Sequence, residues 1–449
     1  MGEYLSAYLA GRRPDPALRA RVHASLRRSA QAKRLADPAY QAFAKSLTPA
    51  EALNLYAEAI GRLTALYPDA DRSAPGRLFA LGRTEFDRAL SAPSFRSAFL
   101  GSLTDAELLA FRTWLRGIAP PSTVADARQA VRDVSREAQT RLRVTAPAAV
   151  VLEFLAGACG GLDEFTAYLP PTAATDPKGD YGDYGLTLAG GVVSRVEPLS
   201  WAAHVRLKPG DRVVHTERGP GAVRLTVAGR PTPVTLPVPP PTVFGAEATG
   251  MAGVVGYIRL AAFREDTPDA LDDALLSLTA RGVRAVVIDV RGNPGGQLAS
   301  AVHVAERFLT GGIVVTTAGR APEFAGRVFS SASGMTASTL PVVLLADART
   351  MSAAEALAGA WKDHKRATLV GTQTFGKGTV QAQLTLLAAD RPGAAPRSGT
   401  LVLTVATMAG PHGRPLDGYG VLPDITEPDP DRQLELAIRR ATELAAGMP

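Results

Sequence analysis

One pattern repeats in the second half of the chain and limits the folds that it can adopt. An apolar run is followed by a turn and then by a helix-forming stretch. RAVVIDV, at 284–290, precedes the glycine turn RGNPGGQ, and LPVVLLAD, at 340–347, precedes a helix-forming stretch that begins near Ser352. Continuous apolar runs of this length are typical of parallel strands that are covered on both faces. The pattern therefore predicts an α/β unit with a mainly parallel sheet.

The residues just before this pattern extend it. VGYIRLAAF, at 255–263, predicts another strand, and 267–282 predicts a helix that ends in a glycine. In sheets of this kind, ligand chemistry lies beyond the carboxyl ends of the strands. Gly295–Gly296 and Ser352 both fall at such ends.

The rest of the chain differs in texture, and the whole is expected to be a multidomain α+β protein. Apolar residues at three- and four-residue spacing predict a helical N-terminal domain, for which a dimerisation or docking module is the alternative. Glycine, proline and aspartate then mark a connecting segment, and many short β-like pieces follow it. We assign the domains as helical at 1–145, connecting and contributing to the core at 146–179, small and β-rich at 180–240, α/β core at 250–435, and helical tail at 436–449.

Composition excludes several classes of function. The net charge of +6 is small for 449 residues, and the arginines are spread out, so no nucleic-acid partner is expected. The single cysteine, Cys159, permits no intrachain disulfide, and we expect it to be a small buried residue. No run of 18 apolar residues and no metal-binding motif is present, so we expect no membrane span, metal or cofactor.

The first residues of the chain bear on its compartment. They contain no basic stretch followed by an apolar one. We therefore expect either a cytosolic protein or an export signal that lies outside this chain.

Ser352 and Lys377 could form a nucleophile with its base. Serine is a poor nucleophile until a base takes its proton, and lysine serves only when it is neutral. Bringing a lysine pKa to about 7 requires a bias of about 4.6 kcal/mol against the charged form, which burial can supply. The residues from 374 to 380 around Lys377 are otherwise uncharged, and Gln381 could orient the amine or a water molecule.

Acyl transfer also needs donors for the negative charge that develops on oxygen. The backbone N–H of Ala353 belongs to a first helical turn, whose N–H groups have no partner inside the helix. Gly295 and Gly296 offer further N–H groups that no side chain shields. The predicted helix adds positive potential at the same place.

A structural interpretation of these residues remains open. Serine at the start of a helix usually caps it, and Glu355, three residues later, completes a capping box. The glycine–lysine turn fits an ordinary hairpin equally well. Histidine offers no replacement base, because His364 would lie about 18 Å along the same helix and His412 falls in a turn.

At these residues the chain resembles the carboxyl-terminal processing proteases, the tail-specific members of peptidase family S41 with a Ser–Lys dyad and a PDZ domain. The resemblance covers about residues 150–435 and rests on several motifs in order: GLDEFTAYLPP, YGLTL with RLKPGDRVV, VGYIRLAAF, VVIDVRGNPGG, MSAAEALAGAWKDHKRATLVG, TFGKGTVQ and GYGVLPDITEPDP. The interval of 25 residues from Ser352 to Lys377 also matches that family.

The resemblance implies a fold and roles for residues. The fold would be a PDZ-like domain joined to a crotonase-like or ClpP-like serine protease core. Ser352 would be the nucleophile, Lys377 the general base and Gln381 its support. The oxyanion hole would use the N–H groups of Ala353 and of the turn that contains Gly295 and Gly296. The loop that would bind the C-terminal carboxylate of the substrate consists of Gly185, Leu186, Thr187 and Leu188.

Some features depart from the family. Ala354 stands two residues after the serine, where a second serine is common, and the PDZ-like segment is short and poor in apolar groove residues. The helical N-terminal domain, residues 1–145, is also larger than the resemblance to this family leads us to expect. Members of the family are usually exported, which suggests an extracytoplasmic compartment.

Three functions follow as hypotheses. The first is a serine endopeptidase that needs no cofactor and cuts protein substrates near free, flexible C-termini. The second is a catalytically inactive, PDZ-containing peptide-binding adaptor. The third is an acyl-CoA enzyme of crotonase type, which would explain neither the PDZ-like segment nor Lys377. A homo-oligomer that forms through the N-terminal helices is plausible under each hypothesis.

Overall fold

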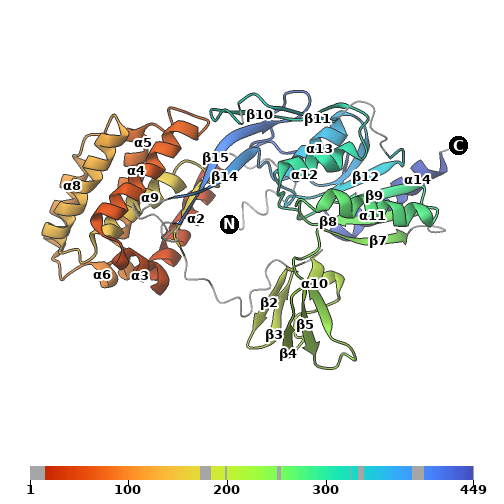
Figure 1. Cartoon of the computed structure of the whole chain (residues 1–449), viewed down its shortest axis with the longest axis horizontal. Helices are drawn as coiled ribbons and strands as arrows, with labels where there is room; N and C mark the ends of the chain where they lie inside the picture. The colour runs from red at the N-terminus through yellow and green to blue at the C-terminus, as the bar shows by residue number, and fades with distance from the viewer. Residues whose placement is uncertain are drawn as a thin grey trace.

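The computed structural model describes residues 16–171, 184–197, 200–249, 254–323, 325–331, 338–386 and 399–447. These residues form a helical part, a small β-rich module and a larger core of two sheets with helices. In Figure 1 the helical part and the core occupy opposite ends of the molecule, and the long strands β14 and β15 run between them.

The helical part is built from amphipathic helices with defined caps. The Thr48 side chain accepts the N–H of Glu51, and the Glu51 carboxylate accepts the N–H of Thr48, which fixes the start of one helix. The helices are α2 (Pro16–Ala36), α3 (Pro38–Ser46), α4 (Pro49–Leu66), α5 (Pro75–Ala89), α6 (Pro93–Phe99), α7 (Asp105–Arg116), α8 (Val124–Leu142) and α9 (Pro147–Gly160).

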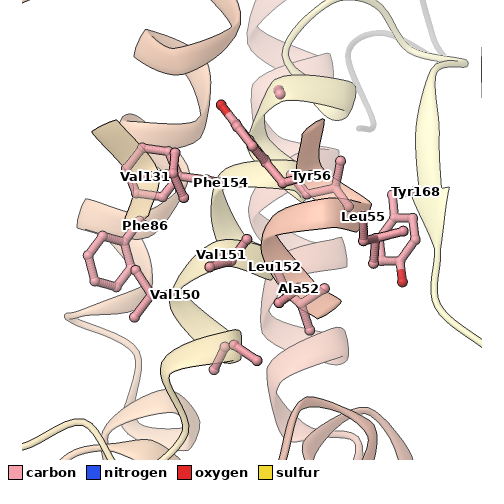
Figure 2. Packing of buried hydrophobic residues seen from close by; sticks show 14 of the residues in the cluster. Ala52, Leu55, Tyr56, Phe86, Val131, Val150, Val151, Leu152, Phe154 and Tyr168 are labelled. Carbon is pink, nitrogen blue, oxygen red and sulfur yellow. The ribbon is translucent and has the colours of Figure 1, made fainter. Parts of the chain in front are cut away.

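Helix α9 is the centre of this part, as Figure 2 shows. Phe154 packs against Phe79 and Phe86, with ring centroids 5.3 and 5.8 Å apart. The helical domain therefore extends beyond the predicted boundary at residue 145. The helix is apolar on nearly every face, so it is stable only when other helices surround it. Cys159 lies on it and is buried, as predicted.

The module after the helical part consists of short antiparallel strands around a small apolar core. Among the described residues, β2 pairs only with β3, while β4, β5 and β6 form a second small sheet. Its elements are β2 (Leu186–Ala189), β3 (Val192–Val196), α10 (Trp201–His204), β4 (Val213–Arg218), β5 (Ala222–Val227) and β6 (Val234–Pro237).

The core contains the predicted parallel sheet. Its strands have the order β16-β13-β12-β9-β8-β7, and all pairs from β16 to β8 are parallel. Only β7 (Val243–Thr249) runs antiparallel to its neighbour. The parallel strands are β8 (Val255–Leu260), β9 (Ala285–Asp289), β12 (Val342–Ala346), β13 (Ala367–Gly371) and β16 (Ile425–Thr426), and the connecting helices are α11 (Thr267–Ala280), α12 (Leu298–Glu306) and α13 (Ala353–Asp363).

A second, antiparallel sheet stands beside the parallel one and was not predicted. Its order is β1-β15-β10-β11, and β14 also pairs with β15. Residues of β15 pack into the same apolar cluster as the helical part, so this sheet joins the two ends of the molecule. Its strands are β1 (Ala167–Leu169), β10 (Gly312–Gly319), β11 (Val328–Ser331), β14 (Thr379–Thr385) and β15 (Thr400–Ala409).

The C-terminal helix is part of the core rather than a tail. Helix α14 (Pro430–Ala446) begins before the predicted boundary at 436. Ala437, Ala441 and Ala445 recur at four-residue intervals and pack on one face of the parallel sheet. The small side chains let the helix approach the sheet closely, which explains why it covers this face.

Candidate active site

Ser352 stands at the start of α13, beyond the carboxyl end of β12. Its backbone has φ 57° and ψ −121°, which residues other than glycine rarely adopt. Strain of this kind costs on the order of 1–3 kcal/mol and clusters at functional sites. A sharp turn between strand and helix is also the geometry that exposes a nucleophilic hydroxyl above a sheet.

Lys377 lies in the loop between β13 and β14, and its amine reaches Ser352. The Nζ atom donates to Ser352 Oγ at 3.4 Å, to Gln381 Oε1 at 2.5 Å and to the Thr379 carbonyl at 3.4 Å. Gln381 is itself oriented, because its Nε2 donates to the hydroxyls of Thr379 and Thr404 at 2.9 and 3.1 Å. The structure thus brings the three predicted side chains Ser352, Lys377 and Gln381 together.

The surroundings of Lys377 favour its neutral form. Burial lowers the pKa of the Lys377 amine below its ordinary value, and the carboxylates of Glu355, Asp163 and Asp417 oppose this shift. The Phe165 ring lies over the amine, with its centroid 4.8 Å from Nζ. A ring in this position excludes water from one side of the amine, which adds to the burial that favours the neutral form, and only the neutral amine can act as a base.

Glu355 connects the serine turn to the lysine loop, a role that the sequence analysis missed. Its carboxylate is buried and accepts the backbone N–H groups of Ser352, Gly376 and Lys377 at 2.9, 2.6 and 2.7 Å. It also accepts the Thr374 hydroxyl at 2.5 Å. Burial raises the pKa of Glu355, and these hydrogen bonds act against that rise. Four donors that converge on two oxygens fit the ionised carboxylate.

The predicted capping box is therefore present, but its glutamate also binds groups outside the helix. In a box, the glutamate would satisfy only the serine N–H. Here Glu355 also binds a loop that is 22 residues further along the chain. Its spacing from the serine was visible in the sequence, whereas its contact with the lysine loop depends on the tertiary fold.

The glycine turn after β9 lies against Ser352. A Cβ atom on Gly295 would come within 2.8 Å of Ser352 Cβ and 3.0 Å of Ala353 N, and one on Gly296 would come within 2.1 Å of Phe263 O. The N–H of Gly295 donates to Asn293 Oδ1 at 2.8 Å, so it is occupied within the turn. Of the predicted oxyanion donors, Gly296 and Ala353 are therefore the better candidates.

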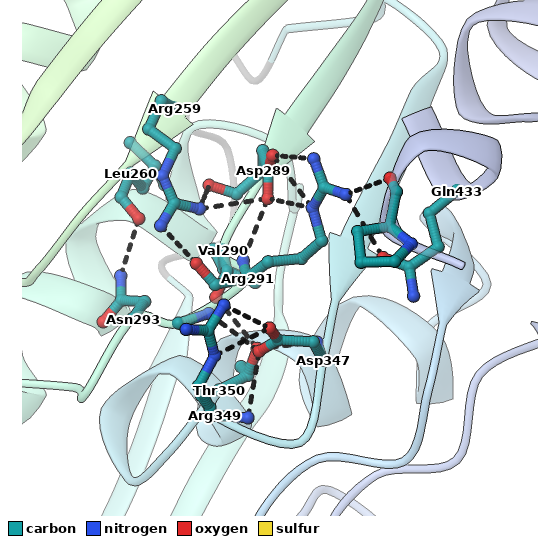
Figure 3. Close-up of polar contacts among 12 residues, drawn as sticks. Arg259, Leu260, Asp289, Val290, Arg291, Asn293, Asp347, Arg349, Thr350 and Gln433 are labelled. Carbon is teal, nitrogen blue, oxygen red and sulfur yellow. Dashed lines mark hydrogen bonds and ion pairs between the residues drawn. The ribbon is translucent and has the colours of Figure 1, made fainter. Parts of the chain in front are cut away.

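A buried ionic cluster directly precedes this turn in the chain (Figure 3). Asp289, at the end of β9, binds Arg259 and Arg291 at 3.0 and 2.7 Å, and all three side chains are almost completely buried. Burial alone would raise the pKa of Asp289, but the two guanidinium groups outweigh it and hold that pKa below its usual value. Arg291 also donates to the Pro430 carbonyl at 2.7 Å, which fixes α14 to the turn.

A cavity of about 490 Å³ opens beside the serine and lysine. Apolar side chains form much of its wall, and Ser352 and Lys377 lie at its edge. Its apolar lining residues are Phe263, Pro294, Leu298, Ala353, Val380 and Met408. A cavity of this size accommodates a few side chains of an extended peptide.

The predicted carboxylate-binding loop lies in the small module, on a different element from Ser352. Leu186, Thr187 and Leu188 form β2, and Gly185 precedes it with φ 70°. No helix separates β4 from β5: the hairpin closes directly, with Gly219 N donating to Ala222 O at 2.9 Å. The module therefore offers the edge of a strand, without a helix between those strands to form the second wall of a groove.

The remaining side chains that could do chemistry lie elsewhere. His364 is at the far end of α13, where its Nε2 contacts the Ile313 carbonyl at 2.7 Å, and His412 is exposed. Burial raises the pKa of the Cys159 thiol to about 12, which keeps it protonated. Within the described ranges, no cluster of three or more His, Cys, Asp or Glu side chains is arranged to hold a metal ion. In the same part of the chain, no helix has both the length and the hydropathy needed to cross a bilayer.

Comparison with known proteins places this site in a class of peptidases. The model of peptidase family S41 matches residues 254–427, a range that contains Ser352, Lys377 and Gln381. A carboxy-terminal-processing protease of Bartonella bacilliformis is 30% identical over 302 residues, which cover 60% of this chain and 67% of that protein. The chain therefore belongs to peptidase family S41, and the resemblance noted in its sequence is confirmed.

Other relatives match a shorter part of the chain. A chloroplastic C-terminal processing peptidase of Tetradesmus obliquus is 36% identical over 171 residues, 38% of this chain and 34% of that protein. A carboxyl-terminal-processing protease of Synechocystis is 35% identical over 170 residues, 38% and 37% of the two chains. These matches span about a third of each relative. The structure of the photosystem II D1 C-terminal processing protease aligns with a TM-score of 0.47 and 22% identity, over 88% of this chain and 97% of that one.

Proposed function

We propose that the protein is a serine endopeptidase that uses Ser352 as nucleophile and Lys377 as general base. The contact between Lys377 Nζ and Ser352 Oγ at 3.4 Å, around an amine whose burial favours the neutral form, carries the proposal. Neutral Lys377 would take the serine proton while Oγ attacks the carbonyl carbon of a peptide bond. Gln381 would hold the amine in line through its contact with Nζ.

The rest of the reaction follows from the same arrangement. The N–H groups of Gly296 and Ala353 would stabilise the negative oxygen of the tetrahedral intermediate. When that intermediate collapses, protonated Lys377 would give its proton to the leaving amine, and an acyl ester on Ser352 would remain. Water, deprotonated by the neutral lysine, would then hydrolyse the ester and restore both side chains.

Two alanine variants test the mechanism. Ser352→Ala and Lys377→Ala are each expected to abolish cleavage of an unstructured polypeptide, with cuts mapped by mass spectrometry. Lys33→Ala, at an exposed position on α2, is the matched control and should cleave as the wild type does. Full activity of either site variant, in a protein with an unchanged thermal melt, would remove that residue from the mechanism.

The inactive adaptor is separated from the enzyme by labelling. A serine-reactive fluorophosphonate should label Ser352 in the wild type. It should label Ser352 in the Lys377→Ala variant more slowly. An inert Ser352 together with tight binding of peptide C-termini would favour the adaptor instead. Turnover of an acyl-CoA without peptide cleavage would favour the crotonase-type alternative.

We further propose that the small module is a PDZ-like domain that binds the C-terminus of the substrate along β2. The edge of β2 away from β3 has no paired strand among the described residues, so an extended peptide could add there through its backbone. Gly185 lies at the start of this edge, where backbone N–H groups could receive a carboxylate. The short β4–β5 hairpin leaves side chains of the peptide largely uncovered.

A pair of peptides tests this binding mode. A peptide with a free C-terminal carboxylate should bind more tightly than its C-terminal amide, because only the carboxylate can accept N–H groups with full charge. Scrambling the last residues should change affinity little, since the β2 edge contacts mainly backbone. Equal affinity of the acid and the amide would exclude carboxylate recognition.

We also propose that the protein works outside the cytoplasm, in a periplasmic or secreted setting, as its family resemblance suggests. Cell fractionation combined with protease accessibility of the intact protein tests this proposal. Recovery of the native protein in the cytosol alone would contradict it.

A further inference from the structure

Helix α2 lies against the rest of the protein through a row of polar side chains. Arg19, His23, Arg27 and Gln31 recur at four-residue intervals, which places them on one face of the helix. Arg27 and Gln31 contact Glu85, through its carboxylate at 3.0 Å and its carbonyl at 2.8 Å. Polar contacts therefore hold this face of α2 against α5.

The far end of this face is fixed deep in the helical part. Arg34 binds the carboxylate of Glu153 at 2.9 Å, and Glu153 is completely buried in α9. Tyr40 donates to the same carboxylate at 3.0 Å. Removing one partner from a buried cluster of this kind leaves a charge without compensation, so α2 is held firmly at this end.

The near end of the row reaches the surroundings of the catalytic amine. Arg19 Nε donates to Glu164 Oε1 at 2.8 Å, and Arg19 Nη2 lies 3.6 Å from Asp417 Oδ1. Its guanidinium also packs on the backbone of Gly418, where a Cβ atom would come within 3.1 Å of Nη1. Arg19 therefore joins two segments that are far apart in the sequence.

Both segments flank Lys377. Gly418 N donates to the Gly376 carbonyl at 2.8 Å, which fixes the loop that carries the lysine. On the other side, Asp163 Oδ1 accepts the N–H of Phe165 at 2.7 Å, which shapes the turn that places the Phe165 ring over the amine.

A second cavity lies next to the Phe165 ring that covers the Lys377 amine. It has a volume of about 390 Å³ and is lined by Arg19, His23, Phe165 and Thr379 among others. Phe165 lines this cavity and also contacts Lys377, whereas Lys377 itself does not line it. The ring therefore stands between a water-accessible space and the amine.

We propose that Arg19 is a positioning residue for Lys377, because it clamps together the two segments that flank the amine. The helical part would in this way act on an active site whose reacting groups it does not contain. The inference rests on the proposed Ser–Lys mechanism for its effect on activity, but not for its effect on the amine itself.

The direction of the effect follows from the groups that face Lys377. These are the carboxylates of Glu355, Asp163 and Asp417, together with burial. Loss of Arg19 removes the positive charge that compensates Glu164 and Asp417, and it frees the turn that carries Phe165. More negative charge and more water both favour the ammonium, so each change raises the pKa of Lys377.

Competitive labelling of Lys377 measures this directly and needs no peptidase activity. Trace acetic anhydride acylates only neutral amines, so the labelled fraction of Lys377, followed by mass spectrometry against pH, gives its titration midpoint. Arg19→Ala should move that midpoint upward by about one pH unit. Arg28→Ala, an exposed arginine of the same helix, should leave it unchanged.

Peptidase assays supply the second readout. In Arg19→Ala the rise of kcat/KM with pH should shift in the alkaline direction by the same amount, so that activity lost at neutral pH returns at higher pH. Arg19→Lys keeps the positive charge but not the planar guanidinium with its several N–H donors. Its profile should therefore lie between those of the wild type and Arg19→Ala. Glu164→Ala breaks the same clamp but removes a negative charge, so it should shift the profile less far in the alkaline direction than Arg19→Ala does. The double variant should shift it no further than Arg19→Ala.

The outcomes separate the two proposals. A shifted labelling midpoint in a protein that cleaves no peptide would uphold the role of Arg19 and defeat the proposed function. An unchanged midpoint in a folded Arg19→Ala variant would overturn the role of Arg19, and so would a loss of activity that is equal at every pH.

Discussion

Oxygen Oε2 of Glu355 accepts the backbone N–H of Lys377 at 2.7 Å. The same oxygen accepts the backbone N–H of Ser352 at 2.9 Å. One atom therefore sets the relative position of the two residues that the proposed mechanism uses. The carboxylate has no contact with the cavity, so its influence is on geometry rather than on bond making.

Glu355→Gln should lower kcat/KM by about 100-fold or more, which corresponds to about 2.7 kcal/mol. An amide places an NH₂ group against N–H donors that now meet an oxygen, so the lysine loop must move. Steady-state kinetics on an unstructured polypeptide measure the change. Glu435→Gln, at an exposed position on α14, is the control and should keep the wild-type rate. If Glu355→Gln were as active as this control, Glu355 would not be needed to position Ser352 and Lys377.

The pH dependence of activity should follow Lys377. Its pKa lies below the ordinary lysine value, and the base is active when neutral. The rate should therefore rise with pH and level off before the ordinary lysine range is reached. Lys377→Arg should lose a factor of about 10² to 10⁴ in kcat, because arginine does not deprotonate at accessible pH.

The pH profile of the arginine variant distinguishes this cause from misfolding. A protein that still melts at the wild-type temperature, but has no rise of rate between neutral and alkaline pH, fits the prediction. A rate that rises with pH as in the wild type would show that another group is the base.

Asp289→Asn should destabilise the fold by about 3–5 kcal/mol, because it leaves Arg259 and Arg291 without their buried counter-charge. Since the pKa of Asp289 is held below its usual value, its contribution to the free energy of unfolding is complete above the ordinary aspartate range. That contribution is lost as pH falls through the folded-state pKa. Thermal melts of wild type and variant should therefore converge in acid, whereas a constant difference at all pH values would contradict this assignment.

The sequence was most informative where chemistry and backbone geometry leave local marks. The glycine turn, the serine at a helix start and the lysine between glycines each have a recognisable sequence pattern. The parallel strands are predicted by continuous apolar runs. Glu355 was also visible, but only as a helix cap. Its contact with Lys377 depends on how two strands bring separate loops together, which periodicity does not record.

Long-range pairing explains the other misses. β10 and β15 pair although about 90 residues separate the partners Thr316 and Ala409. Neither segment carries a sequence pattern that indicates which strand it pairs with. Helix α9 lacks amphipathic spacing because it is buried on nearly every side, so the helical domain seemed to end too early. Arg19 has no local signal at all, since its partners come from two other segments of the chain.

Gly295→Ala should abolish activity through crowding at Ser352. Gly295 has φ 95°, and a Cβ atom there would lie 2.8 Å from Ser352 Cβ and 2.9 Å from the Met351 carbonyl. The methyl group would push the glycine turn away from the serine and enlarge the oxyanion hole. The expected result is a loss in kcat larger than any loss in thermal stability.

Gly210→Ala is a matched control for this variant. Gly210 also has φ 95°, but nothing lies within 4 Å of the added Cβ atom. The two variants therefore share the same positive φ, which costs a residue with a side chain on the order of 1–2 kcal/mol, and they differ in what the methyl group meets. If both lowered kcat equally, strain rather than crowding at Ser352 would be the cause. If Gly210→Ala alone kept the wild-type rate, the close approach of the glycine turn to the serine would be what catalysis requires.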